Sequence, residues 1–597
     1  MAGLLPALDW ARVDGAAATG RMAAALRLPR IPRKAAVAEG ATLLHPDHPD
    51  MTVVSIGAQG FAVVELRADG TRHVRENGRC SQGTGSFLRQ LVGRFDLDLP
   101  QADLLVANVV DPAHLSGRCP VILKTDMTHL ANRGQDRAQI LAGLYDAVCD
   151  NVRTLIRPRS GGAAMLLAGG AARSSRVRAR FAGFARDLGM TFLDGDPERD
   201  AFLEAFGAAT AASRAPRMGL PAAATLVAPS DPVDFETLPP LAVAMQRVRR
   251  LSATRAPWGD ARRRVVLGLD IGSTGSKAVA VDADGGGPLW DTWARTLGDP
   301  VAAARGLVAD FLAAHGDAAD VVAVGVTGSG RQIVGSLAAS ALGAARIFVL
   351  NEIAAHAAGA VHWDPDVDTI FELGGQDAKY IRLEGGRVVD AAMNEACSAG
   401  TGSFIEEQGR CFEGVGHVGE MGRLALAADH AVSLGQHCSV FMAEVVEQAI
   451  AGGRPREAVL AGLYDSVVGN YLNRVKGARP VGNRVFCQGM PFASDALAAA
   501  VARRTGGVVV VPPDPGTIGA LGIALLARDQ VPAGDAPLPL DALLAARVVT
   551  RDTFTCRSTR GCGAPGNACR IDRLVTEVGG RRGTFTWGGH CALYDRA

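Results

Sequence analysis

Short apolar runs that end in glycine turns recur along the chain, and they predict strand–turn–strand units followed by helices. A strand pair is predicted from Thr52 to Leu66 around a turn at Gly57 to Gly60. A second pair is predicted from Val265 to Asp282, around a turn dense in Gly, Ser and Thr. Further glycine turns follow apolar runs at 166–170, 370–377, 485–490 and 512–522, and helical patterns begin near 87 and 139.

One eight-residue pattern occurs twice, as Cys-Ser-Gln-Gly-Thr-Gly-Ser-Phe from Cys80 and as Cys-Ser-Ala-Gly-Thr-Gly-Ser-Phe from Cys397. A second cysteine follows each copy: Cys119 comes 39 residues after the first and Cys438 comes 41 residues after the second. Leu-Ala-Gly-Leu-Tyr-Asp also recurs, so the duplication spans a whole structural unit. Two equivalent cysteine pairs supply four thiolates, the number that a cubane iron–sulfur cluster requires. The bland alternative is two helix-capping turns that each carry a buried cysteine.

Composition narrows the class of protein. The chain has 597 residues, 48% hydrophobic and 21% charged, with a net charge of +1, which is typical of a soluble globular protein of several domains. The near-neutral balance predicts neither a nucleic-acid nor a membrane partner, and we find no signal peptide or spanning apolar run, so a cytoplasmic location is expected. Eleven cysteines are too few for a disulfide scaffold, and Cys149, Cys411 and Cys487 are expected to pack in the core.

The glycine turns of the second half are candidate phosphate loops, because glycine lets backbone N–H groups approach an anion closely. The turn after Asp270 is not a P-loop, since no Gly-Lys-Ser/Thr follows it. On spacing alone, a plain hairpin with a polar turn explains any single one of these turns equally well. Two hairpins with acidic residues, followed by two glycine turns in order, indicate a nucleotide held between two lobes.

This order of turns resembles the superfamily of sugar kinases, heat-shock chaperones and actin, in which two ribonuclease-H-like lobes close on ATP and a divalent cation. The pattern after Cys397, with a further cysteine about forty residues on, narrows the resemblance to the BadF/BadG/BcrA/BcrD family. These are activator ATPases of 2-hydroxyacyl-CoA dehydratases and benzoyl-CoA reductases. Members are homodimers that hold one 4Fe-4S cluster between subunits and drive electrons to a partner enzyme at the expense of ATP. The implied fold is α/β, a complete two-lobe module preceded by a degenerate partial copy.

The resemblance implies a set of site residues in the second copy. Asp270, Asp377 and Gln376 are the expected catalytic residues, with both aspartates positioning Mg²⁺ and water rather than attacking the phosphate. The remaining nucleotide-binding residues are expected to be Gly272, Ser273, Thr274, Lys277, Gly374, Gly375, Gly489, Gly516 and Gly519. His356 sits where the family has a Glu-x-x-x-His segment, but for this residue a structural role is favoured.

The first copy departs from the family. It has no counterpart of residues 263–350, and Gly60 stands where the second copy has Asp377, so we expect no Mg-ATP there. A pseudo-dimer within one chain is therefore expected, in which Cys80 and Cys119 join Cys397 and Cys438 around a 4Fe-4S cluster that bridges the repeats, and one chain suffices. The expected domains are a partial repeat at 1–215, a linker with solvated charge runs at 216–262, a complete ATPase at 263–530 and a Cys-rich segment at 531–597.

The last segment contains four cysteines in a short polar stretch rich in Gly and Arg: Cys556, Cys562, Cys569 and Cys591. They indicate a metal site, although their spacing is looser than that of zinc ribbons. A second 4Fe-4S cluster is slightly preferred, with structural zinc close behind and a metal-free tail third.

The function expected from these features is ATP-gated electron transfer. Ferredoxin or flavodoxin would be the donor, and an iron–sulfur dehydratase or reductase would be the acceptor, whose identity the sequence leaves open. One alternative is a small-molecule kinase of the same superfamily whose cysteines are structural or bind zinc. Another is a cluster-holding scaffold with a vestigial nucleotide site.

Overall fold

A computed structural model describes residues 10–595 of the chain with gaps. The gaps are at 59, 77–83, 116–122, 124–125, 129, 132–133, 159–162, 216–218, 228–233, 253–254, 256, 259–260, 286, 395–399, 410–411, 413, 416, 532–535, 559, 561 and 563–567. Cys80, Cys119, Cys397 and Cys411 therefore lie outside the described residues. The chain forms two compact units, the first from 1–127 and 136–232 and the second from 128–135 and 233–597.

The first unit is built on one five-stranded sheet in the order β3-β2-β1-β4-β5. Its central strand β1 runs antiparallel to β2 and parallel to β4, and both β1 and β2 are fully buried, which confirms the strand pair predicted around Gly57. The bounds are β1 (Met51–Ile56), β2 (Phe61–Leu66), β3 (Arg72–Glu76), β4 (Ala164–Ala168) and β5 (Thr191–Phe192).

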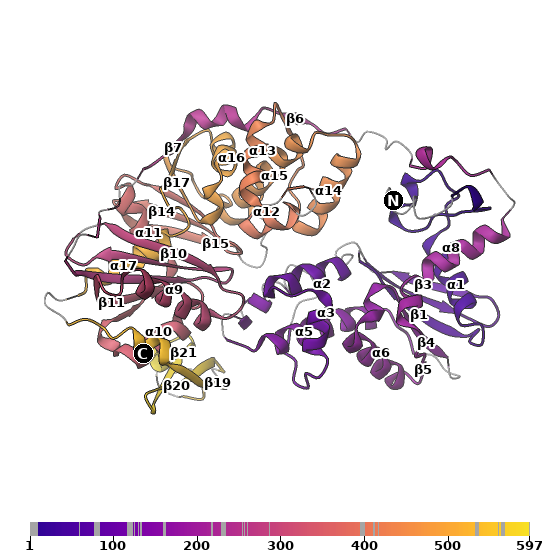
Figure 1. Cartoon of the computed structure of the whole chain (residues 1–597), viewed down its shortest axis with the longest axis horizontal. Coiled ribbons are helices and arrows are strands. Elements are labelled where there is room, and N and C mark those ends of the chain that lie inside the picture. The colour runs from indigo at the N-terminus through magenta and orange to yellow at the C-terminus, as the bar shows by residue number, and fades with distance from the viewer. Residues whose placement is uncertain are drawn as a thin grey trace. The chain divides into compact units, whose positions relative to one another are not determined.

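Helices α1 and α6 contact different strands of this sheet, and α2, α3 and α5 pack against one another, with α3 and α5 also against α6 (Figure 1). Val37, Ala38 and Ala41 of α1 pack on β1 and β2 together with Leu203 of α8. The helices α1 and α8 touch at Gly40, where a side-chain carbon would come within 2.0 Å of the Leu203 carbonyl oxygen. The bounds are α1 (Arg33–Leu44), α2 (Thr84–Val92), α3 (Leu99–Val106), α5 (Arg137–Arg153), α6 (Ser175–Asp187), α7 (Pro197–Asp200) and α8 (Leu203–Arg214), so the helices predicted near 87 and 139 are confirmed.

The second unit contains a first lobe with the sheet order β10-β9-β8-β11-β12. The hairpin of β8 and β9 carries the predicted Gly, Ser and Thr turn at residues 272–274, and no helix opens there. The bounds are β8 (Arg263–Ile271), β9 (Gly275–Asp282), β10 (Pro288–Arg295), β11 (Ala319–Thr327), β12 (Ile347–Val349), α9 (Pro300–His315) and α10 (Arg331–Leu342).

The second lobe of this unit has the order β15-β14-β13-β17-β18-β7, which repeats the first unit's β3-β2-β1-β4-β5 with one strand added. The helices α11 and α17 pack against each other, as α1 and α8 do, with α17 on the first-lobe sheet and α11 on the second. The strands are β13 (Thr369–Leu373), β14 (Ala378–Glu384), β15 (Arg387–Met393), β17 (Arg484–Gln488) and β18 (Val508–Val511). The helices are α11 (Glu352–Trp363), α12 (Gly402–Gly409), α13 (Val418–Ala427), α14 (Ser439–Ala451), α15 (Arg456–Tyr471), α16 (Asp495–Thr505) and α17 (Ile518–Arg528).

The added strand comes from the segment expected to be a linker. Its second half belongs to the second unit, where β7 (Val248–Arg250) pairs parallel with β18 and β6 (Thr237–Leu238) pairs with β16 (Ala431–Val432). The basic runs lie at the surface as the sequence predicted, since Arg247, Arg249 and Arg250 are exposed. Arg250 also pairs with Asp495 at 2.6 Å, and the exposed Arg262 pairs with Asp320 at 2.8 Å.

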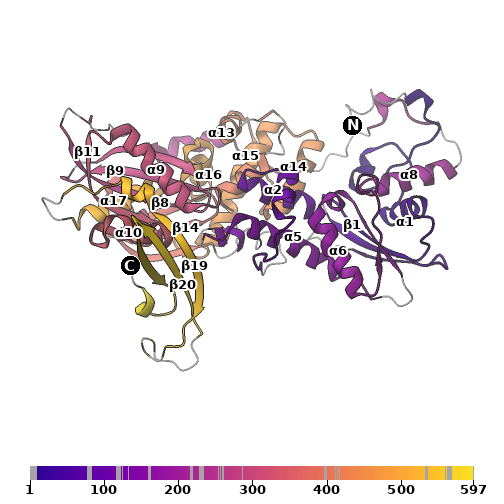
Figure 2. The ribbon, with the colours of Figure 1, turned by 60° about the horizontal axis from the view of Figure 1, so that its bottom comes forward.

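The C-terminal segment forms a small antiparallel sheet that stands on the first lobe beside α10 (Figure 2). Leu574 and Phe585 join the core of that lobe, and Thr576 Oγ1 lies 2.8 Å from Ser340 Oγ on α10. The bounds are α18 (Asp541–Ala545), β19 (Arg547–Thr555), β20 (Arg570–Val578) and β21 (Arg581–Trp587). Within the described ranges, no helix combines the length and apolar character needed to cross a membrane.

Candidate nucleotide-binding site

The β8–β9 turn is held in shape by a threonine that the sequence did not single out. Thr296, at the end of β10, donates its hydroxyl to the Gly272 carbonyl at 2.7 Å, and its N–H donates to the Thr274 carbonyl at 3.1 Å. Its side chain is buried and also lies 2.9 Å from Ser276 Oγ. These hydrogen bonds hold the backbone of the turn in place from the β10 side.

Asp270 is the penultimate residue of β8 and is 5% exposed. Lys277, its cross-strand neighbour on β9, places Nζ 3.3 Å from Asp270 Oδ2. Burial disfavours the charged carboxylate, but the Lys277 ammonium, with His356 and Lys379, outweighs burial and holds the pKa of Asp270 below its ordinary value. Asp270 is therefore ionised at neutral pH, which suits a group that faces a cation.

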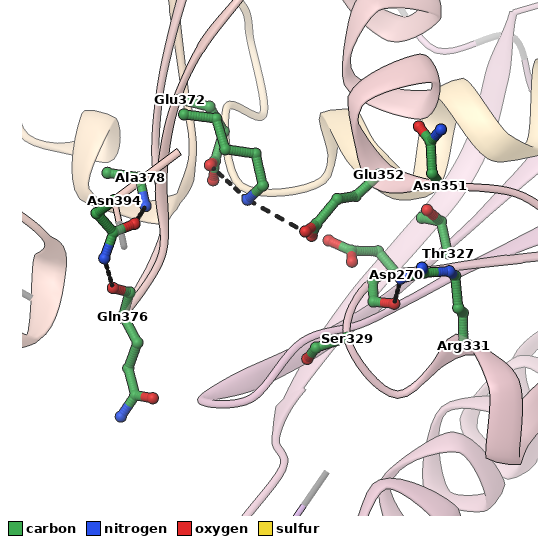
Figure 3. A network of polar contacts seen from close by, with 12 residues as sticks. Asp270, Thr327, Ser329, Arg331, Asn351, Glu352, Glu372, Gln376, Ala378 and Asn394 are labelled. Atoms are coloured by element: carbon green, nitrogen blue, oxygen red, sulfur yellow. Dashed lines mark hydrogen bonds and ion pairs between the residues drawn. The ribbon is translucent and has the colours of Figure 1, made fainter. Parts of the chain in front are cut away.

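A buried charge network stands opposite Asp270 (Figure 3). Lys379 on β14 places Nζ 2.9 Å from Glu372 on β13 and 3.5 Å from Glu352 at the start of α11, as the dashed lines ending on those two carboxylates show. Burial alone would lower the pKa of Lys379, but the two glutamates and Asp377 raise it above its ordinary value. Lys379 and Glu372 are 3% and 4% exposed, so this ion pair belongs to the lobe interior.

The second turn, between β13 and β14, faces the first. A side-chain carbon on Gly375 would lie 2.6 Å from Thr274 Oγ1, so the two predicted phosphate loops approach each other at a point where only glycine fits. The Gly374 N–H donates to the Asp377 carbonyl at 2.8 Å and closes the turn. Asn394 donates to the Gln376 carbonyl at 3.0 Å (Figure 3). The Gln376 side chain accepts a hydrogen bond from Thr128 Oγ1.

The two later glycine turns close the far side of the site. Gly489 follows β17 with φ of 104°, its N–H donates to the Pro515 carbonyl at 2.7 Å, and a side-chain carbon there would lie 2.0 Å from the Leu373 carbonyl oxygen. Gly516 lies against Met490. Gly519, in the first turn of α17, lies where a side-chain carbon would be 3.0 Å from both Asp270 Oδ2 and His356 Cε1.

Three buried polar atoms around the site have no hydrogen-bond partner among the described residues: Thr274 Oγ1, His356 Nδ1 and Gln488 Oε1. His356 is 7% exposed, and burial, reinforced by the Lys379 charge, lowers its pKa to about 4, so the ring is neutral at pH 7. Orphaned buried polar atoms call for a ligand or ordered water. Together with the glycine-lined turns and the ionised Asp270, they fit a nucleotide with a hydrated cation.

The second turn is also bonded to the helix that follows Cys397. The Gly402 N–H donates to the Gly374 carbonyl at 2.9 Å, and the Ser403 N–H donates to the Gly375 carbonyl at 2.8 Å. Ser403 Oγ donates to the same Gly375 oxygen. These contacts join the candidate phosphate loop to the first turn of α12.

Helix α14 begins directly after Cys438, which is its N-cap residue. Gln408 of α12 donates to the Ser439 carbonyl at 2.8 Å, so α12 and α14 are bonded where α14 begins. Cys438 is partly exposed and free of disulfide. Among the described side chains, no group of three or more His, Cys, Asp or Glu residues is close enough to hold a metal ion.

The structure brings together most of the residues that the sequence predicted. Asp270 and Lys277 pair directly, Thr274 meets Gly375, and Gly519 meets Asp270. Sequence reasoning missed Thr296 and the Lys379 network. The Glu372 and Lys379 pair was detectable in principle, because two opposite charges face each other across a predicted hairpin.

The curated relatives of this chain include activators of acyl-CoA dehydratases. It is 30% identical over 266 residues to the 2-hydroxyisocaproyl-CoA dehydratase activator of Clostridioides difficile, covering 44% of this chain and 95% of that one. It is 28% identical over 212 residues to the (R)-2-hydroxyglutaryl-CoA dehydratase activating ATPase of Acidaminococcus fermentans, covering 35% and 77%. Similarity extends to a benzoyl-CoA reductase subunit of Thauera aromatica, at 25% identity over 38% of this chain and 77% of that one.

Among solved structures, component A of the Acidaminococcus fermentans (R)-2-hydroxyglutaryl-CoA dehydratase matches 45% of this chain and 98% of its own, with 24% identity and a TM-score of 0.40. The sheet orders confirm the expected α/β fold of the ribonuclease-H-like actin and sugar-kinase superfamily, with a complete two-lobe module after a partial copy. The sequence model of the BadF/BadG/BcrA/BcrD ATPase family matches residues 18–183 and again 267–527, one segment in each copy, and the chain belongs to that family.

Proposed function

We propose that this protein is an ATP-dependent activator that passes low-potential electrons from ferredoxin or flavodoxin to a partner iron–sulfur dehydratase or reductase. Its relatives named as dehydratase activators and as a benzoyl-CoA reductase subunit support this assignment. Cys80, Cys119, Cys397 and Cys438 would hold one 4Fe-4S cluster, which supplies a one-electron redox centre. Within the chain, the second copy alone would hydrolyse ATP.

In the nucleotide site, Asp270 would face Mg²⁺ because its carboxylate is kept ionised beside Lys277. Asp377 is partly exposed at the second turn and would share the positioning of Mg²⁺ and water. The turn backbones at Gly272 to Thr274 and at Gly374 to Gly375 would cradle the phosphates, and Gly489, Gly516 and Gly519 would leave room for the adenosine. Phosphoryl transfer to water needs mainly this positioning and charge stabilisation.

The observation that carries the proposal is the set of hydrogen bonds from Gly402 and Ser403 to the Gly374 and Gly375 carbonyls. Any change in the second turn on nucleotide binding would be transmitted to the first turn of α12, which begins five residues after Cys397. The bond from Gln408 to Ser439 would carry the same movement to the start of α14, beside Cys438. A nucleotide event can thus alter the surroundings of two cysteines without direct contact.

The test compares wild type with Ser403→Ala, which removes one of the bonds to Gly375. We expect a non-hydrolysable ATP analogue to slow amide hydrogen exchange at 400–409 and to shift the EPR spectrum of the dithionite-reduced protein. In Ser403→Ala, the analogue should still bind, but both responses should shrink. Ser213→Ala, at an exposed position on α8, serves as the matched control and should behave as wild type.

Three results would overturn the proposal. One is a purified protein without iron that phosphorylates a small metabolite, as a kinase of this superfamily would. Another is a full iron signal in Cys438→Ser or Cys80→Ser. The third is absence of ATP hydrolysis together with an Asp270→Ala variant that behaves as wild type, which would favour a scaffold.

A further inference from the structure

Three strand ends lie together at one end of the C-terminal sheet, away from its contact with α10. This end is called the tip. Strand β19 ends, β20 begins and β21 ends on this side, because the strands are antiparallel. Cys556 directly follows β19, Cys569 directly precedes β20 and Cys591 comes after β21, while Cys562 lies on the connection from β19 to β20. The strand order therefore places these four cysteines at one end of the sheet, whose strands β19 and β20 are seen in Figure 2.

Hydrogen bonds and close approaches join these four residues to one another. The Cys556 N–H donates to the Cys569 carbonyl at 2.7 Å. The Cys591 sulfur accepts from the Cys562 N–H and bonds the Cys562 thiol. A side-chain carbon on Gly589 would lie 3.6 Å from Cys569 Cβ, so the chain that leads to Cys591 passes beside Cys569. The contacts link all four cysteines without a disulfide.

The chain after β21 also folds back over Cys556. Tyr594 bonds the Cys556 sulfur through its hydroxyl, stacks edge-on against Phe554 at 5.4 Å and accepts at its carbonyl from Thr586 Oγ1 at 2.7 Å. The Leu593 N–H donates to the Cys591 sulfur.

The apolar contacts at the tip are small in extent. Leu574 and Phe585 of this sheet join the core of the first lobe, whereas Ile571, which is 1% exposed, lies at the tip beside Gly589. At the tip, Cys556 is buried while Cys562 is exposed, and Cys569 and Cys591 are partly exposed. A small three-stranded sheet with so few apolar contacts at one end gains stability from a staple such as a metal ion.

The charge around the four cysteines and their exposure favour one kind of metal ion. Four thiolates around a divalent ion carry net negative charge, and the ligand positions are flanked by Arg557, Arg560 and Arg570. The partly open setting of three cysteines suits Zn²⁺, which has no redox chemistry and forms closed tetrahedral sites with four cysteines. Among the described side chains the four cysteines do not lie close enough together to hold a metal ion, so a binding site would form only when an ion draws them together.

We propose that Cys556, Cys562, Cys569 and Cys591 form a structural zinc site that fastens the end of the C-terminal sheet. Binding forms four Zn–S bonds and releases the four thiol protons, with no change of oxidation state. The site is separate from the nucleotide and from the four cysteines assigned to the cluster, so it stands whether or not the proposed electron transfer does.

The test measures zinc and iron per chain by mass spectrometry of the elements, in the full-length protein purified anaerobically. We expect about one zinc per wild-type chain, lost in the double variant Cys562→Ser/Cys591→Ser, whose iron content stays unchanged. Cys438→Ser is the crossed control, which should lower iron and leave zinc intact. Cobalt added to the zinc-free protein should give the visible bands of a tetrahedral thiolate site.

Cys591→His supplies a conservative replacement, because His is also a zinc ligand, and it should retain zinc. This variant keeps the proposal testable even where the double serine variant fails to fold. Loss of iron instead of zinc in the double variant would overturn the assignment in favour of a second cluster. Wild-type protein without zinc, with peptide masses showing these cysteines as disulfides or as free thiols, would also overturn it.

Discussion

The sheet of the first unit and the sheet of the second lobe share one strand order, yet the charged side chains at equivalent positions differ between them. In the second copy, the first residue of α11 is Glu352, and it reaches Lys379 of β14. In the first copy, the first residue of α1 is Arg33, and Ala62 stands where β14 has Lys379. The two copies therefore share the scaffold but differ in the residues that begin the first helix and occupy the second strand.

In the first copy, a side chain also fills the space that the nucleotide site needs in the second copy. The second residue of α17 is Gly519, which leaves room beside Asp270, whereas the second residue of α8 is Glu204. Glu204 pairs with Arg33 at 2.8 Å and accepts from Ser55 at 3.0 Å. A self-sufficient ion pair thus occupies the position that remains open in the ATPase copy.

One contact survives in both copies. The Gly85 N–H donates to the Gly57 carbonyl at 3.2 Å, as the Gly402 N–H does to Gly374. The bond between the glycine turn and the helix of the repeated cysteine motif has therefore outlasted the loss of the first phosphate loop. Comparison of the copies separates what nucleotide binding requires from what the cysteine-bearing helix requires.

The largest expected difference between the copies concerns their buried charges. Lys379→Ala leaves Glu372 and Glu352 buried without their cation and should destabilise the second unit by about 3–5 kcal/mol. Arg33→Ala should cost about 1 kcal/mol or less, since the Arg33 and Glu204 side chains are 30% and 27% exposed. Denaturant unfolding followed by hydrogen exchange in each unit measures both. Equal losses would show that the two networks are equivalent.

Introducing the first copy's glutamate at the equivalent position of the second copy should strongly reduce ATP hydrolysis. Gly519→Glu places a second negative group beside Asp270, and a penalty of about 3 kcal/mol would lower ATP hydrolysis about 10²-fold. Gly306→Glu, in open space on α9, is the matched control and should hydrolyse ATP normally. Normal hydrolysis by Gly519→Glu would contradict the placement of the nucleotide.

A pH-dependent difference should follow from His356, because its counterpart on α1 is Val37. The folded pKa of about 4 lies below the ordinary 6.5, so between these values the unfolded chain binds a proton that the folded chain does not. Stability of the second unit should therefore fall as pH is lowered from 6.5 to 4, by at most about 3 kcal/mol. The melting temperature of His356→Val should depend less on pH over this window than that of the wild type. An unchanged slope would mean that other groups carry the dependence.

The smallest difference is expected where the copies agree. Asp146 accepts two bonds from Arg176, and Asp465 pairs with Arg503 and Arg504, each aspartate ending the repeated Leu-Ala-Gly-Leu-Tyr-Asp motif. Replacement of either aspartate by Asn should cost about 2 kcal/mol in its own unit. Protection of α5 and α15 against hydrogen exchange reports the two losses separately. If the losses caused by the two replacements differ by more than about 1.4 kcal/mol, which is tenfold in the opening equilibrium, the two aspartates do not play equivalent roles.

Local pattern was sufficient to predict the hairpins, the glycine turns and the duplication. The strand pairs around Gly57 and Gly272 are each formed by neighbouring segments, so apolar runs and turn residues contain the needed information. The approach of Thr274 to Gly375 was also implied once two phosphate loops were assigned to facing lobes.

Contacts between distant segments could not be predicted in the same way. Strand β7 pairs parallel with β18 across about 260 residues, and nothing in three residues of a basic segment marks a strand. The bond from Thr128 to Gln376 spans 248 residues. The burial of Lys379 depends on α11, whose Glu352 lies far from it in sequence, so the charged residue alone predicts an ordinary solvated side chain.

The strand β7 has a practical consequence for dissection of the protein. It covers the edge of β18, which would otherwise present unpaired N–H and C=O groups to other chains. The match to the family begins only at 267 in this half, after β7 and the start of β8. An excised ATPase fragment that starts there would have a bare sheet edge and should self-associate, whereas one that starts near 234 should stay dispersed.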